Sequence, residues 1–134
     1  MSLYISTTFS IDKTPVTKVL KLLEYNKIFN IELGSNHIWQ PSILKKIKKY
    51  KCNFLVHNYF PVPKKNLVVN IASQDLAIRK KSINHIKKSI TFSKKINAKL
   101  YTFHPGFILD PISQNTSSKN YDFIFKKYNK KNIN

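Results

Sequence analysis

The sequence is poor in cysteine and in long apolar runs, and each shortage excludes a class of protein. The single cysteine, Cys52, excludes an internal disulfide and is typical of a reducing compartment. No apolar run approaches the roughly 20 residues needed to span a bilayer. The N-terminal segment Met1–Thr8 lacks the basic and apolar regions of a signal peptide. We therefore expect a cytoplasmic protein with no membrane partner, and 134 residues suffice for one domain.

Arginine is almost absent, although the chain is strongly basic. The formal net charge is +18, with 24 lysines and arginines against 6 acidic residues, yet Arg79 is the one arginine. Nucleic-acid recognition favours the bidentate arginine fork. The lysines are also spread among abundant Asn and Ile, which share AT-rich codons with Lys. We therefore favour compositional bias over a dedicated nucleic-acid surface and expect no specific nucleic-acid partner. The charge still predicts salt-sensitive attraction to polyanions.

What the sequence does contain is an alternation of short apolar runs and helical patterns. Apolar runs rich in β-branched and aromatic residues predict four strands, at Leu3–Phe9, Ile28–Leu33, Cys52–Asn58 and Leu100–His104. Helices are expected from a Thr14 cap to about Asn26, from Pro41 onward, and from a Ser73 cap to about Asn97. The buried side of the last helix is expected to hold Leu76, Ile83, Ile86 and Ile90. Tyr121–Tyr128 is expected to begin a fourth helix, followed by a polar tail.

Three titratable residues stand at or near the ends of different predicted strands. Alternating strands and helices predict a parallel sheet, and right-handed crossovers place its strand ends on one side. Glu32, His57 and His104 fall there. Two imidazoles and a carboxylate form a ligand set for zinc and similar metals, although a histidine could instead be a general base or an oxyanion partner. Glu32 could equally face solvent, and either histidine alone is better explained as a hydrogen-bonded strand-end residue. Both histidines together favour a site.

An ordered series of motifs carries a family resemblance. The motifs are Ile31–Gly34, His57–Tyr59 with the proline loop that follows, Val69–Ser73 and Phe103–Gly106. Over about residues 2–112 the series resembles the first four βα units of the xylose isomerase-like TIM-barrel superfamily. That superfamily includes sugar-phosphate isomerases and epimerases and the endonuclease IV type of AP endonuclease. The resemblance implies an α/β fold in which residues 1–112 form the N-terminal half of a (β/α)8 barrel. Residues 113–134 are expected to form a polar loop and a partial helix or tail.

The resemblance also implies roles for the three strand-end residues. It implies that His57 and His104 bind a divalent metal (zinc, manganese or magnesium) and that Glu32 is the catalytic candidate. The Asn58–Pro63 loop is closer to the sugar isomerase branch. We therefore expect first an isomerase or epimerase of a small-molecule sugar or sugar phosphate, in which the metal polarises the substrate oxygens. The alternatives are an endonuclease IV-like enzyme that cleaves abasic DNA and a half-barrel remnant without catalysis.

The chain departs from this family in its length. A full barrel has eight strands and about 250 residues, whereas this sequence provides four strands. A catalytic metal site usually needs three protein ligands, and a half barrel would expose two sheet edges and its interior face. We therefore expect a truncated or split product. Such a product is either inactive alone or completed by a second copy or by a complementary half-barrel.

Overall fold

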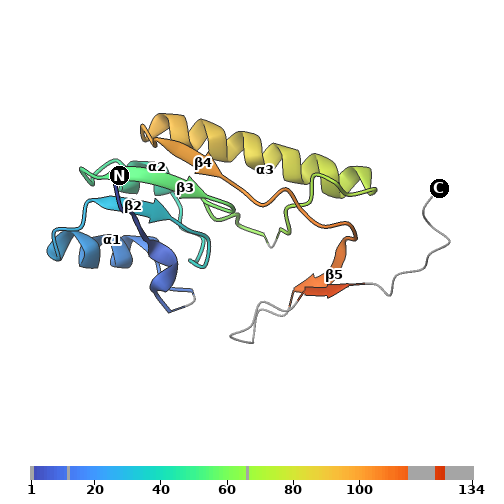
Figure 1. The fold of residues 1–134 in the computed structure, drawn as a ribbon, viewed down its shortest axis with the longest axis horizontal. Coiled ribbons are helices and arrows are strands. Elements are labelled where there is room, and N and C mark those ends of the chain that lie inside the picture. Colours follow the sequence, from blue (N-terminus) through green and yellow to red (C-terminus); the bar gives the residue numbers. More distant parts are fainter. Residues whose placement is uncertain (1, 12, 66, 115–122, 126–134) are drawn as a thin grey trace.

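The computed structural model describes residues 2–11, 13–65, 67–114 and 123–125. Its centre is a four-stranded parallel sheet in the order β1-β2-β3-β4 (Figure 1). The strands are β1 (Ile5–Ser6), β2 (Asn30–Leu33), β3 (Asn53–His57) and β4 (Leu100–Thr102). Their order in the sheet follows their order in the chain, as successive βα units require. The predicted α/β class, with four parallel strands alternating with helices, is confirmed and is consistent with a half-barrel.

Three α-helices connect these strands: α1 (Val16–Tyr25), α2 (Ile43–Ile47) and α3 (Leu76–Lys95). Helix α3 begins later than predicted, because the Asp75 carboxylate, and not Ser73, caps it by accepting from the N–H groups of Ala77 and Ile78 at 2.7 and 3.2 Å. Of the helices in the described ranges, none combines the length and apolarity needed to cross a membrane.

The first and last strands of the sheet are shorter than predicted. After Ser6 the chain turns into a short 3-10 helix, η1 (Thr7–Phe9), because the Ser6 hydroxyl accepts from the Thr8 N–H at 3.4 Å. Strand β4 ends at Thr102, which pairs with the last residue of β3. His104 therefore lies in the loop after β4 and not in the strand itself.

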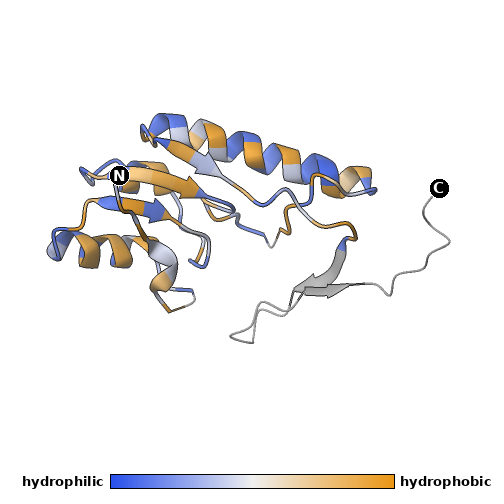
Figure 2. Ribbon diagram, in the orientation of Figure 1, coloured by the Kyte–Doolittle hydropathy of each residue, from blue (hydrophilic) through white to orange (hydrophobic). Residues whose placement is uncertain are grey.

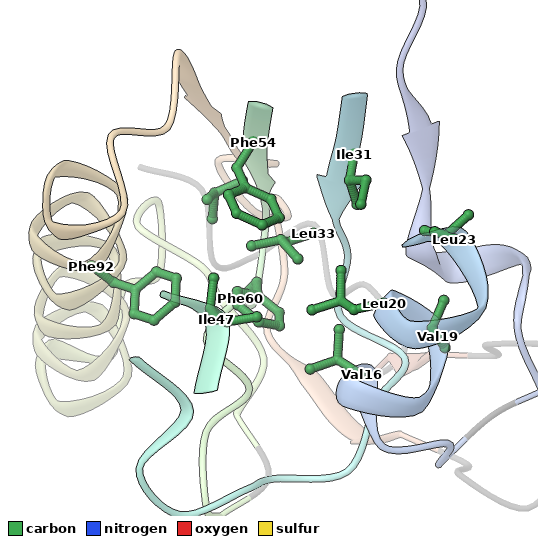
Figure 3. Packing of buried hydrophobic residues seen from close by; sticks show 11 residues of the cluster. Val16, Val19, Leu20, Leu23, Ile31, Leu33, Ile47, Phe54, Phe60 and Phe92 are labelled. Carbon is green, nitrogen blue, oxygen red and sulfur yellow. The ribbon is translucent and has the colours of Figure 1, made fainter. Parts of the chain in front are cut away.

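One face of the sheet and the inward sides of the helices form the core. Along β2 and β3 every second side chain is buried, namely Ile31, Leu33, Phe54 and Val56. Helix α1 covers this face with Val16, Val19, Leu20 and Leu23, as its helical spacing predicts (Figure 3). Phe60, after β3, packs edge to face against Phe92 of α3 with 5.5 Å between ring centroids. Burying side chains of this size contributes about 1.5–3 kcal/mol each, so this layer holds the strand ends in place.

Helix α3 buries a different face from the one predicted. Leu76, Ile83 and Ile90 are 69%, 39% and 52% exposed, and of the predicted face only Ile86 is buried. The other buried positions are Ser82, His85, Ser89, Phe92 and Ser93. Two of these serine hydroxyls donate to backbone carbonyls one turn earlier. Ser82 donates to Ile78, and Ser93 donates to Ser89. Small side chains satisfied in this way allow the helix to lie close to the sheet, and α3 accordingly mixes hydrophilic and apolar residues along its length (Figure 2).

A second, two-stranded sheet follows β4. Strand β5 (Pro111–Gln114) pairs antiparallel with β6 (Phe123–Phe125). The strand β6 lies in the segment expected to begin a fourth helix, and its Phe-Ile-Phe sequence consists of residues that favour strands. The rest of that expected helix and the predicted polar tail lie outside the described residues. The division at residue 112 stays a prediction.

Candidate metal centre

The structure brings His57 and His104 together at the carboxyl ends of two neighbouring strands. His57 is the last residue of β3, and the loop after β4 places His104 beside it. Their imidazoles meet edge to face, with 5.2 Å between ring centroids and 89° between ring planes. His57 is half-buried and His104 is exposed. Two of the three predicted site residues therefore share one location, open to solvent on the side of His104.

The end of β3 is fixed by a set of contacts with β4. The backbone N–H of Asn58 donates to the carbonyl of Thr102 at 2.7 Å, and the hydroxyl of Tyr101 donates to the carbonyl of Asn58 at 3.0 Å. Asn58 has a positive φ of 50°, a conformation that asparagine adopts more readily than most residues. These bonds turn the backbone sharply after His57. The turn leaves His57 at the carboxyl end of β3.

The ring of His57 is oriented by Thr102. Its Nδ1 lies 2.8 Å from the hydroxyl oxygen of Thr102. When Nδ1 carries the proton and donates to this oxygen, Nε2 holds the free lone pair that a metal requires. Metal-binding histidines commonly donate their second ring nitrogen to a neighbouring oxygen in this way. The geometry of His57 therefore fits a metal ligand.

Glu32 lies on the face of the sheet that carries His57 but nearer to the amino ends of the strands. It is half-buried and pairs with Ser6 on one side and Leu55 on the other. Leu55 precedes His57 by one full pleat of β3, a step of roughly 7 Å. In the described ranges no group of three His, Cys, Asp or Glu residues is close enough to hold a metal. The structure therefore brings the two histidines together without Glu32, whose catalytic role stays a prediction.

The donor set fits part of a metal centre. Two imidazoles suit zinc better than magnesium, which prefers oxygen ligands. The residue after His57 contributes a second observation, because Oδ1 of Asn58 is buried and has no hydrogen-bond partner within the described residues. A buried acceptor without a donor costs about 1–3 kcal/mol. A bound water or substrate that donates to this oxygen would remove that cost.

Two buried polar clusters near the strand ends were not found from the sequence. Asn70 is fully buried, and its side-chain amide donates to Asp110 at 2.8 Å, which joins two loops beside the histidines. The available signals were a polar Asn70 within the apolar run Leu67–Ile71 and an acidic Asp110 in a chain with few acids.

The second cluster surrounds His37, a residue that the sequence only places in a loop. His37 is 4% exposed, and its Nδ1 donates to the carbonyl of Thr14 at 2.9 Å. Its Nε2 accepts from the hydroxyl of Thr7 at 2.8 Å, and that hydroxyl oxygen accepts from the N–H of Gly34 at 2.9 Å. Burial lowers the pKa of His37 below its ordinary value, which keeps the ring neutral. His37 therefore links η1 to the segment just before α1, and Thr7 extends this link to Gly34, which follows β2.

The chain is similar to the apurinic-apyrimidinic endonuclease 1 of Plasmodium falciparum (isolate 3D7). The two are 27% identical over 111 residues, which cover 79% of this chain and 19% of that protein. The chain thus spans about a fifth of the length of that relative. No protein-family model matches the chain, and none of the solved structures matches it significantly.

Proposed function

We propose that this chain supplies part of the metal centre of an AP endonuclease-type enzyme, which cleaves the phosphodiester backbone of DNA at abasic sites. The edge-to-face contact of His57 and His104 at adjacent strand ends carries the proposal. The similarity to an apurinic-apyrimidinic endonuclease supports a nuclease. It lends no support to the sugar isomerase or epimerase that the Asn58–Pro63 loop first led us to expect.

In this function His57 and His104 hold a divalent cation, for which zinc is the best match to imidazole ligands. When bound there, such a cation would supply charge neutralisation at the phosphate and would activate water as a nucleophile. Thr102 keeps the ring of His57 oriented toward the site. Glu32, on the same face of the sheet, is the candidate for proton transfer. The net charge of +18 assists attraction to the DNA backbone without reading its sequence.

Two features support a partner that completes the site. A catalytic zinc usually has three protein ligands, and the described residues bring together two histidines. Parallel sheets are also usually covered on both faces, whereas the face that carries His57 includes Leu100, which is 54% exposed. We therefore propose that further strands cover this face. A second copy or a complementary half-barrel would supply them together with the missing ligands.

A metal and nicking assay tests the proposal. Zinc content is measured in the wild-type protein and in a His57→Ala/His104→Ala variant, with His85→Gln as a control whose histidine lies in α3. We expect bound zinc in the wild type and in the control, and its loss in the double variant. Equal zinc in all three proteins would overturn the metal centre.

The DNA substrate is tested separately, using the protein together with any chain that copurifies with it. A duplex that contains one abasic analogue should be nicked, the nicking should stop with chelator, and an undamaged duplex should remain intact. Zinc binding without nicking of the abasic duplex would overturn the nuclease and leave a binding module or an enzyme for another substrate.

A further inference from the structure

We infer that Asn70 and Asp110 are positioning residues, which together hold the His104 loop so that His104 faces His57. The inference rests on the proposed function only in identifying the histidine pair as the site. Within the described residues, neither Asn70 nor Asp110 is hydrogen-bonded to an imidazole of the pair, so both act through the loop that carries His104. The contacts of each residue support it in turn.

Asn70 lies between two loops and bonds to both. Its side-chain Oδ1 accepts from the backbone N–H groups of Ala72 at 3.1 Å and Phe107 at 3.2 Å. Its Nδ2 donates to Oδ1 of Asp110 at 2.8 Å, and its own backbone N–H donates to the hydroxyl of Ser82 at 2.9 Å. The residue is 0% exposed. A buried amide is costly unless it is bonded, so the three bonds of the side chain explain why it can lie in the interior.

Both carboxylate oxygens of Asp110 accept hydrogen bonds from the loop that contains Asn70 and Ser73. Oδ1 accepts from Asn70, and Oδ2 accepts from the hydroxyl of Ser73 at 2.6 Å. Hydrogen bonds to an ionised carboxylate are shorter and stronger than neutral ones. Ser73 is itself 2% exposed and accepts from the N–H of Asp75 at 3.0 Å. The carboxylate therefore anchors the chain after Gly106 to the start of α3.

The backbone after His104 follows a path that Asn70 defines. The carbonyl of Pro105 accepts from the N–H of Ile71 at 2.9 Å. Gly106 has a φ of 138°, and a Cβ at that position would overlap the side-chain amide of Asn70. Phe107 then donates to Asn70. Three successive residues after His104 thus contact Asn70 or its neighbour.

The consequence is that the two imidazoles are positioned by different means. His57 is held by β3 and by Thr102, whereas β4 ends at Thr102 and leaves His104 to the loop. Weakening the bond between Asn70 and Asp110 should therefore release His104 and leave His57 in place.

Charge exchange between the two residues tests this inference. Asn70→Asp places two carboxylates against each other, which opposes the contact. In the Asn70→Asp/Asp110→Asn double variant the carboxylate at position 70 accepts from the amide at position 110, and the contact is restored. The readout is the nuclear Overhauser effect between the ring protons of His57 and His104, recorded on the full chain without added metal. We expect at least a five-fold loss of this signal in the single variant and its recovery in the double variant.

Asp75→Ala is the matched control, because it removes a carboxylate that caps α3 in the neighbouring turn. It should lower the melting temperature and leave the signal between the histidines unchanged. If Asn70→Asp does not fold, Ser73→Ala removes one of the two donors to Asp110 and should reduce the signal partially. If Asn70→Asp folds, an unchanged histidine signal in that variant would overturn the inference. If it does not fold, an unchanged signal in Ser73→Ala would overturn it. So would an equal loss in Asp75→Ala.

Zinc titration of the same proteins separates this inference from the proposed function. In one outcome the wild type shows the histidine signal and the double variant recovers it, while the wild type binds no zinc. That result would contradict the metal centre and leave the positioning role intact. Equal zinc affinity in the wild type and in a folded Asn70→Asp variant would contradict the positioning role and leave the metal centre intact.

Discussion

The hydroxyl oxygen of Thr102 lies 2.8 Å from Nδ1 of His57, across the pairing of β3 with β4. His104, in the loop that follows β4, contacts the same His57 ring, with 5.2 Å between ring centroids. The pairing of β3 with β4 thus sets the ring orientation of His57, whereas the loop after β4 positions His104. This relationship makes Thr102 a direct test of the site.

Thr102→Val should weaken metal binding without unfolding the protein. Valine has nearly the shape of threonine but cannot hydrogen-bond to the ring of His57, and loss of such a partner typically lowers metal affinity about 10- to 100-fold. Isothermal titration with zinc measures the change. Thr91→Val is the matched control, because the Thr91 hydroxyl donates to the carbonyl of Lys87 within α3. Equal affinities of the two variants would argue against the role of Thr102.

Acid should destabilise the protein through its two buried histidines. Burial lowers the pKa of His37, and burial together with the nearby Lys88 lowers the pKa of His85. The unfolded chain therefore binds more protons than the folded chain once the pH falls below the ordinary histidine value of 6.5. Their contribution to stability is complete above that pH and decreases as the pH falls toward the folded-state pKa values.

Urea unfolding between pH 8 and pH 5 measures this dependence. The free energy of unfolding should be constant at the upper end and fall below about pH 6.5. His37→Gln should be less stable at pH 8 and should show a shallower fall. A wild-type free energy that does not change across the range would contradict this prediction.

Gly106→Ala should both destabilise the protein and disturb the histidine pair. The added methyl group would overlap Asn70, and a φ of 138° is strained for any other residue. We expect a loss of about 1–3 kcal/mol together with a weaker signal between the two imidazoles. Gly34→Ala is the comparison, since its methyl group would meet the exposed side chain of Thr8, which can rotate away. That variant should keep the histidine signal of the wild type.

The buried face of α3 can be tested with two isoleucines of the same helix. Ile86 is 9% exposed and Ile90 is 52% exposed. Ile86→Ala should cost about 2–4 kcal/mol through lost packing, whereas Ile90→Ala should cost less than about 1 kcal/mol. Denaturant unfolding of both variants provides the comparison. Equal losses would mean that both positions are buried, as the helical spacing alone predicts.

The sequence by itself determined the α/β class, the four strands and the positions of His57 and His104 near strand ends. These properties depend on local periodicity and on turn residues such as Pro105 and Gly106, and both can be read from neighbouring positions. The buried face of α1 was predicted for the same reason, because its apolar residues lie on one side only.

The tertiary structure alone decided which face of α3 is buried, how far Glu32 lies from the histidines and how the His104 loop is held. Leu76, Ile83 and Ile90 recur at helical spacing, but close packing on the sheet selects the serine side instead. Asn70 and Asp110 meet across distant segments of the chain, and no local pattern marks such a pair. Short-range periodicity specifies the elements. Contacts between segments far apart in the sequence determine which side chains share a site.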